Sequence, residues 1–306
     1  MAGFLALRGA GQINSDLQRG QTMSRSGVSA FCISAGIVLS LGLLGGAHGQ
    51  SAPTPNFDGG QGGWEHARGA RPMPAPGSAP IIRQDPGHPF TPGQGRTYQI
   101  ADLSNPNLKP WVKEVMKKDT AAIDAGNYVG YTNDAGTWVP FQPDAACTPA
   151  GIPNMYMNAG RLTFMQTPRE VLIMKGSGQD IQHIYLDVPH SPNPKPSWMG
   201  ESVGHYEGDT LVVDTVGLNN RTVLDAFRTP HTDKLHVVQR WRMIESGKGL
   251  ELTVTVDDPE TFYQPYSMVM RVQRGGEPLL EEICAENNFN FGLFDFHMPV
   301  ASKADF

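Results

Sequence analysis

The residues best suited to acid–base chemistry lie in one short stretch, Thr229–His236, which reads Thr-Pro-His-Thr-Asp-Lys-Leu-His. His231 precedes an expected strand and His236 stands near its beginning, so both imidazoles can gather at one rim of a sheet. Period-two alternation places Arg240 on the same face as His236. A histidine beside an arginine suits proton transfer next to an oxyanion, which the guanidinium stabilises. If this face lines a cavity, we expect His231 to carry the proton, with His236 and Arg240 as its partners.

The opposite face of the same strand supports a competing interpretation. It carries mainly apolar residues: Leu235, Val237, Gln239, Trp241 and Met243. If Trp241 belongs to the core, Arg240 and Arg242 are ordinary surface charges. The apolar content of the Trp241 side favours this interpretation, although His231, in a loop, is less constrained by it.

A second group of polar residues is placed by a predicted β-hairpin. Glu207-Gly208-Asp209-Thr210 has glycine at the first position of a two-residue loop, as a type II′ turn requires. One face of the hairpin then carries Val203, His205, Glu207, Thr210, Val212 and Asp214, and the other carries Ser202, Gly204, Tyr206, Leu211, Val213 and Thr215. The second face predicts a barrel interior with Tyr206 as a hydrogen-bonding wall. The first is most simply solvated; the alternative places His205 and Asp214 inside as an acid–base pair.

Motifs for other chemistries are weak. Gly200-Glu-Ser-Val-Gly204 matches the nucleophile elbow of hydrolases, but that motif needs a helix after the serine, and here a hairpin follows. A metal site needs three or four converging ligands, of which His231 and His236 supply two. The possible third ligands are His190, His205, Asp233 and Glu286. We therefore expect no cofactor, with one divalent metal at His231 and His236 as the minor alternative.

The first 49 residues read as an export signal. A charge-free apolar run, Ala30–Leu44, ends in small residues, with Ala47 and Gly49 at the −3 and −1 positions of a cut before Gln50. Met23 is the expected start, and the alternative is an N-terminal membrane anchor. Cleavage predicts a periplasmic or secreted protein with no stable membrane span.

The composition indicates which partners the protein can bind and whether its cysteines form a disulfide. The net charge of −6 argues against a nucleic-acid binder, which needs a basic stripe. After cleavage two cysteines remain, Cys147 and Cys284, and an oxidising compartment favours a disulfide between them over two buried thiols. Gln50–Tyr98 is rich in proline and glycine and is expected to be a disordered tail.

The rest of the chain, residues 99–306, predicts a single β domain with one helix. Pro110 begins an amphipathic pattern that runs to about Ala125, with Trp111 and Val115 on one face. Nine period-two runs follow, at Leu162–Met165, Glu170–Lys175, Ile181–Leu186, Ser202–Glu207, Thr210–Gly217, Leu235–Ile244, Leu250–Val256, Ser267–Gln273 and Leu279–Ala285. Without helices between them, the strands should pair antiparallel and close. We predict an all-β, up-and-down barrel of eight to ten strands with the helix against one end; a two-sheet sandwich is the alternative.

Several motifs in order resemble a family of secreted bacterial proteins of unestablished function. They are Cys147-Thr-Pro-Ala-Gly-Ile-Pro153, the hairpin Gly204–Thr215, Thr229–His236, Asp257-Asp-Pro259 and Glu281–Asn287. The family's hairpin usually has tryptophan where this chain has Tyr206, and it usually has glutamate where this chain has Gln239. The resemblance implies a lipocalin-like barrel and an exported address, and it implies no substrate.

These observations lead to one functional hypothesis and two rivals. We expect an exported barrel that binds a small apolar or aromatic molecule in an interior pocket. It is interpreted as a cofactor-independent acid–base enzyme, a lyase, isomerase or hydrolase, with candidate catalytic residues His231, His236, Arg240, Tyr206 and Asp214. The rivals are a non-catalytic periplasmic carrier or sensor, and an envelope interaction protein that uses the proline- and glycine-rich tail.

Overall fold

The computed structural model describes residues 54–66, 70–89, 99–126, 130–132, 138–140, 148–157, 160–176 and 180–276, with backbone alone for 130–132 and 138–140. The expected signal, the three cysteines and the ninth predicted strand lie outside these residues. No helix of the described part is long and apolar enough to cross a membrane.

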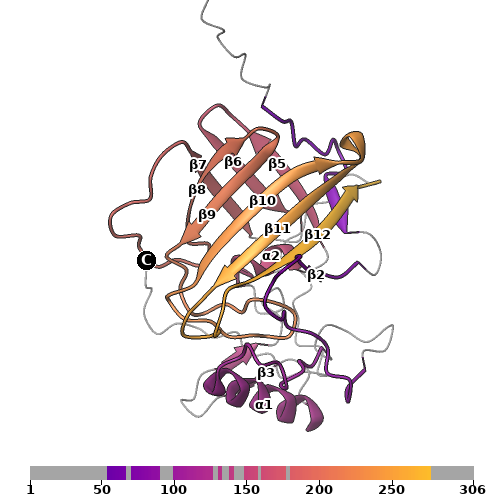
Figure 1. Ribbon diagram of the computed structural model, residues 1–306, viewed down its shortest axis with the longest axis vertical. Helices are drawn as coiled ribbons and strands as arrows, with labels where there is room; N and C mark the ends of the chain where they lie inside the picture. The colour runs from indigo at the N-terminus through magenta and orange to yellow at the C-terminus, as the bar shows by residue number, and fades with distance from the viewer. Residues whose placement is uncertain are drawn as a thin grey trace, which may run out of the picture. The chain divides into compact units, whose positions relative to one another are not determined.

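The described chain is built around a closed β-barrel, as the sequence predicts (Figure 1). Its nine strands are β1 (Trp64–His66), β5 (Arg161–Gln166), β6 (Glu170–Lys175), β7 (Ile181–Leu186), β8 (Glu201–Glu207), β9 (Thr210–Val216), β10 (His236–Ile244), β11 (Gly249–Asp257) and β12 (Tyr266–Arg274). They follow one another in this order around the barrel, and β1 closes it by pairing with both β5 and β12. A two-residue strand, β2 (Met73–Pro74), pairs with β12 beside this closure.

One pair of strands departs from the predicted antiparallel topology. β7 and β8 run parallel, with Ile184 opposite Ser202 and Leu186 opposite Gly204. Residues 187–200 connect them and return the chain to the end at which β7 began, because a parallel pair needs a long connection of this kind. The barrel is therefore mixed. Gly204 suits the junction, since a Cβ there would lie 2.9 Å from Ile184 Cγ2.

The closing strand comes from the stretch that the sequence predicted to be a disordered tail. Trp64 in β1 is fully buried, and its indole Nε1 donates to the carbonyl of Phe57 at 2.7 Å. Phe57 is also fully buried and packs on Phe164, with ring centroids 5.6 Å apart. The high proline and glycine content of this segment predicted disorder. The burial of two large aromatic rings in the core outweighs the poor strand propensity of the segment.

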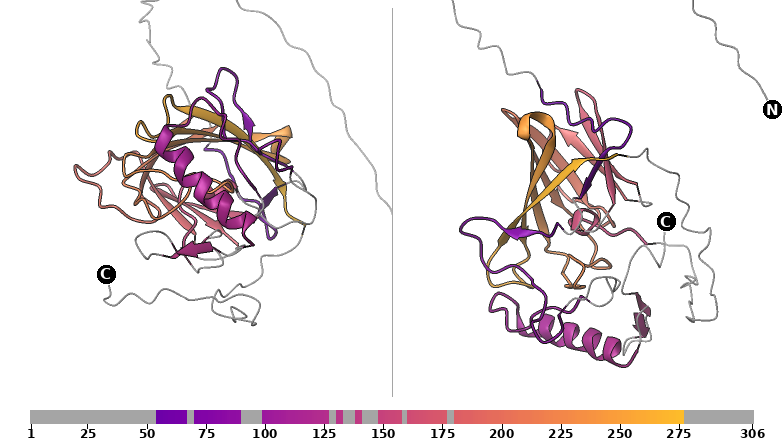
Figure 2. Two further views of the ribbon diagram at one scale, coloured as in Figure 1. Left: turned by 90° about the horizontal axis from the view of Figure 1, so that it is seen from below. Right: turned by 90° about the vertical axis from the view of Figure 1, so that its right-hand side faces the viewer.

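The predicted helix is present as α1 (Pro110–Asp124), and it lies across one end of the barrel (Figure 2). Val112, Met116 and Ile123 are buried, whereas Trp111 remains partly exposed. The Trp111 indole donates to the carbonyl of Glu260 at 2.6 Å, in the loop between β11 and β12. We call this the loop end of the barrel; it also holds residues 217–235 between β9 and β10.

The remaining elements are short. They are α2 (Asn154–Met157), the antiparallel pair of β3 (Gly130–Thr132) and β4 (Trp138–Pro140), and a 3-10 turn, η3 (Glu245–Gly247), between β10 and β11. Tyr156 of α2 enters the barrel, where its ring meets Trp241 edge-on with centroids 5.1 Å apart. Helix α2 therefore contributes to the interior from the chain segment that precedes β5.

The predicted hairpin register is confirmed: β8 and β9 pair Val203 with Asp214, Gly204 with Val213 and Tyr206 with Leu211. Gly208 takes the positive φ of 61° that the turn needs. The face with Ser202, Leu211 and Val213 points inward and is buried. His205 and Glu207 are on the solvated face, as the simpler interpretation held.

Candidate functional site

Inside the barrel, polar side chains from four neighbouring strands and α2 form a buried network. Gln182 on β7 is its centre, and its Nε2 donates to Ser202 Oγ at 2.8 Å, Thr215 Oγ1 at 3.2 Å and Gln239 Oε1 at 2.8 Å. Tyr156 donates its hydroxyl to Gln182 Oε1. Ser202 and Thr215 also bond each other at 2.8 Å.

This network stabilises the barrel wall, and it does not present reactive groups to a ligand. Gln182, Thr215 and Gln239 are fully buried, and burial raises the pKa of the Tyr156 hydroxyl above its ordinary value of 10.0, so it stays neutral. Buried polar groups of this kind stabilise one arrangement because each must find a partner. The network therefore fixes β7 against β8, β9 and β10.

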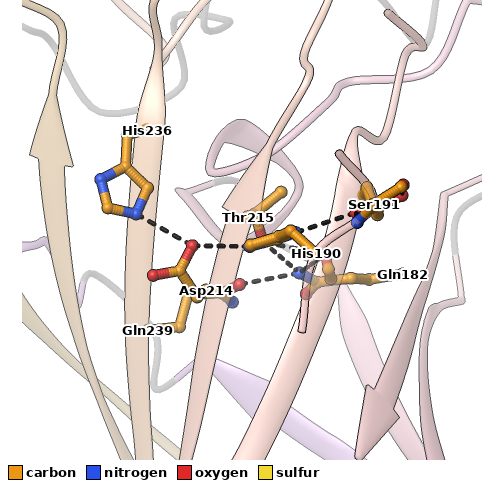
Figure 3. A network of polar contacts seen from close by, with 9 residues as sticks. Gln182, His190, Ser191, Asp214, Thr215, His236 and Gln239 are labelled. Carbon is orange, nitrogen blue, oxygen red and sulfur yellow. Dashed lines mark hydrogen bonds and ion pairs between the residues drawn. The ribbon is translucent and has the colours of Figure 1, made fainter. Parts of the chain in front are cut away.

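On the outer surface of the same strands, a second network joins two histidines to two carboxylates (Figure 3). Asp214 Oδ1 lies 2.9 Å from His236 Nε2 and 2.9 Å from His190 Nε2. The other ring nitrogen of His190 lies 3.0 Å from Glu201 Oε1. Ser191 completes the chain of contacts, since its backbone N–H donates to Glu201 Oε1 at 2.7 Å and its hydroxyl donates to Oε2. All four ionisable groups are partly exposed.

The electrostatics of this outer network favour ionised carboxylates. Hydrogen bonds from the Ser191 hydroxyl and backbone lower the pKa of Glu201. Burial acts to raise the pKa of Asp214, but hydrogen bonds from His190 and His236 outweigh it, and the pKa is lowered. A neutral imidazole donates from one nitrogen only, so the imidazolium form of His190 is the one that donates to both carboxylates. The arrangement links β8, β9, β10 and the connection between β7 and β8 through ionisable side chains.

A groove of about 500 Å³ adjoins this network on the outer wall, beside the parallel junction. The residues that line it include Ile181, Tyr185, Ser191, Lys195, Met199 and Glu201. Ile181 and Tyr185 are about half exposed. The groove touches the network at Ser191 and Glu201, whereas His190, Asp214 and His236 do not line it.

A larger pocket of about 680 Å³ lies at the loop end of the barrel. Its buried wall is made by Ile81, Ile82, Tyr266 and Met268, and Phe227 and Met157 add further apolar surface. Arg71 and Arg83 are exposed at its rim, and the less exposed Gln84 and Asp225 add polar groups to the lining. Its volume falls within the range of about 300–1,000 Å³ typical of small-molecule sites.

Two titratable groups of this pocket have shifted pKa values. Burial raises the pKa of Asp225, against hydrogen bonds from Thr229 and Phe227 that lower it. Burial also raises the pKa of Tyr266 well above 10.0, and the nearby charge of Asp225 adds to this effect. An apolar pocket with a few polar groups and shifted pKa values is typical of ligand-binding sites.

The structure brings together only two of the five predicted catalytic residues, His236 and Asp214. Arg240 points outward on β10 and pairs with Glu207 at 2.6 Å, because Trp241 occupies the interior. Tyr206 does face the barrel, and its hydroxyl accepts a hydrogen bond from Gln166 Nε2 at 2.8 Å. The five residues therefore do not line one cavity, and their catalytic role stays a prediction.

His231 is buried in the loop before β10, apart from both the pocket and the groove. Its Nε2 lies 2.8 Å from Thr222 Oγ1, and its Nδ1 lies 2.9 Å from the carbonyl of Thr232. Burial lowers its pKa below 6.5. The pairing of His231 with His236 at one rim is thus not observed, and within the described residues no three histidine, cysteine, aspartate or glutamate side chains are placed to hold a metal ion.

Sequence reasoning missed the residues that complete both sites. His190 entered only as a possible metal ligand, and Glu201 and Asp225 were not candidates. His190 stands in a proline-rich stretch, Pro189–Pro196, whose path over β8 follows from the parallel junction. The sequence feature that could have identified this part of the site is a lone histidine followed by a serine in the connection between two predicted strands.

Comparison of the chain with protein-family models, with curated proteins and with solved structures finds no match in any of the three.

Proposed function

We propose that this protein binds a small, largely apolar molecule in the pocket at the loop end of the barrel. The observation that carries the proposal is the 680 Å³ volume enclosed by the buried side chains of Ile81, Ile82, Tyr266 and Met268. Filling such a surface with an apolar ligand is favourable by about 25 cal/mol for each Å² removed from water. The export signal expected over residues 1–49 supports a carrier or sensor outside the cytoplasm.

The first experiment measures binding of a neutral apolar probe, N-phenyl-1-naphthylamine, by its fluorescence. Ala226 lines the pocket, so Ala226→Trp should fill it and abolish the fluorescence increase. Ala121→Trp, on the exposed side of α1, is the matched control and should bind like the wild type. Equal binding by the wild type and Ala226→Trp, with both folded by circular dichroism, would refute the proposal.

The second experiment identifies the natural ligand. Native mass spectrometry of the purified protein should show a bound small molecule whose mass adduct is absent from Ala226→Trp. An adduct retained at equal intensity in that variant would locate binding elsewhere.

A second candidate function is acid–base catalysis at the outer network, where His236 and Asp214 meet at 2.9 Å as a catalytic pair would. The groove would place a substrate at the Glu201 end of the network, which is joined to Asp214 through His190. If this holds, the wild type should convert a molecule that co-purifies with Asp214→Asn, and Asp214→Asn should convert the same molecule about 10²-fold more slowly or worse. Conversion at the wild-type rate by Asp214→Asn would exclude the network as the catalytic site.

A further inference from the structure

We propose that the pocket at the loop end is specific for amphipathic anions, molecules with an apolar body and one carboxylate. This inference rests on the proposed function, because it names the ligand class of the same site. The apolar body would lie against Ile82 and Met268, and the carboxylate would lie at the rim beside Arg83.

The pocket has an apolar depth and a cationic rim. Ile81, Ile82, Tyr266 and Met268 are each less than a tenth exposed, whereas Arg71 and Arg83 are exposed. A ligand that is apolar throughout would leave the guanidinium of Arg83 without a partner, and a fully polar ligand would leave the apolar wall uncovered. The gradient from buried apolar surface to exposed cations matches an amphipathic molecule with its charged end outward.

The charge of the pocket favours an anion over a cation. Among the residues that the structure describes, the ionisable ones that line it are Arg71, Arg83, Asp225 and Tyr266, and the tyrosine is neutral. Two arginines face one aspartate, in a chain whose net charge is −6. A local excess of positive charge on an acidic protein attracts anions to that place.

Asp225 is not presented as a counter-charge for a cationic ligand. Its Oδ1 accepts hydrogen bonds from the backbone of Phe227 at 2.9 Å, and from the backbone and hydroxyl of Thr229 at 3.2 and 3.0 Å. Its Oδ2 accepts a further bond from the Thr229 hydroxyl at 2.8 Å. Four hydrogen bonds from residues of its own loop occupy the carboxylate, so Asp225 stabilises the turn. The charge preference of the pocket then depends on the arginines.

Arg83 is the arginine that we assign to the ligand. Its backbone is held by a bond from Asp102 N–H to its carbonyl at 2.9 Å, which fixes the segment at the rim. Within the described residues, no hydrogen bond or ion pair engages its guanidinium. A guanidinium binds a carboxylate through two parallel N–H donors, which ammonium groups cannot do.

The test compares three ligands that share one chain: dodecanoate, its methyl ester and dodecylamine. Each displaces N-phenyl-1-naphthylamine from the wild type, from Arg83→Gln and from Arg83→Lys. Arg169→Gln, at an exposed turn that does not line the pocket, is the matched control.

We expect dodecanoate to displace the probe at roughly a two- to fivefold lower concentration than the ester, which corresponds to one partly exposed ion pair. Arg83→Gln should remove that difference by weakening dodecanoate and not the ester; Arg83→Lys should restore part of it, and Arg169→Gln should leave it unchanged. Equal affinity for acid and ester, or tighter binding of the amine, would overturn the anion preference while the pocket itself stands. If the probe does not bind at all, the proposed function fails instead.

Discussion

Replacing Gln182 by methionine should destabilise the barrel by removing the centre of the interior network without leaving a cavity. The two side chains have similar length and volume, so the change is mainly the loss of hydrogen bonds. Gln182 supplies the donor to Gln239 Oε1 and the acceptor for the Tyr156 hydroxyl. Ser202 and Thr215 keep each other as partners at 2.8 Å.

The magnitude follows from the two groups left without a partner. Each orphaned buried polar group costs about 1–3 kcal/mol, so Gln182→Met should lower the free energy of unfolding by about 2–6 kcal/mol. With a urea dependence of about 2.5 kcal/mol per molar, the unfolding midpoint should fall by roughly 1–2 M. Tyr156→Phe removes one hydroxyl and should cost less than Gln182→Met.

The assay is urea unfolding followed by tryptophan fluorescence, since Trp241 packs directly on Tyr156. Gln264→Met is the matched control, because Gln264 is exposed and its contacts to Asn107 are made by its backbone. A midpoint within about 0.3 M of wild type for Gln182→Met would show that the network contributes little, and would refute the reasoning.

Three further predictions concern burial and protonation. Trp64→Ala should cost about 3–5 kcal/mol in urea unfolding, because the ring is fully buried and its indole bond to Phe57 is lost; a cost under about 1 kcal/mol would mean that β1 does not close the barrel in solution. The folded-state pKa of Asp214 is lowered, so its contribution to stability is present above about pH 4 and is lost as the pH falls through the folded value. In Asp214→Asn the free energy of unfolding should therefore fall less steeply as the pH is lowered. The same dependence on pH as in the wild type would contradict the contacts of Asp214 with the two histidines. Burial lowers the pKa of His231, so the unfolded chain binds the proton first and stability should fall as the pH drops below about 6.5; an imidazole NMR signal for His231 that titrates at or above 6.5 would oppose this.

Much of the barrel could be predicted because its strands are long enough to show alternation. The turn at Gly208 determined the register of β8 and β9, and the apolar side of Trp241 determined which face of β10 is internal. Alternation reports which side of a strand is buried, but it carries no information about the direction of the neighbouring strand. The parallel pairing of β7 and β8 was therefore missed.

The candidate sites were harder to predict because their residues meet only in three dimensions. Asp214 and His236 were both candidates, yet the sequence placed Asp214 beside His205 or in solvent, and not beside His236. Adjacent strands bring them together, since Val238 lies opposite Asp214 in the β9–β10 ladder. The pocket combines residues near positions 70–84, 157, 225–227 and 266–268, and no local pattern links segments so far apart.

The parallel junction explains why polar residues gather on both faces of the same wall. The ladder between β7 and β8 pairs only Ile184, Tyr185 and Leu186, so the first half of β7 lacks backbone partners on that side. Gln182 lies in that first half and reaches across the interior to Ser202, Thr215 and Gln239. On the outer side, His190 and Ser191 of the returning connection bind Glu201 and Asp214. On the inner face the side-chain hydrogen bonds of Gln182 thus replace the missing ladder, and on the outer face those of His190 and Ser191 attach the connection to β8 and β9. The outer network therefore has a structural role at this junction whether or not it also moves protons, and a catalytic assignment must be tested by turnover and not by stability alone.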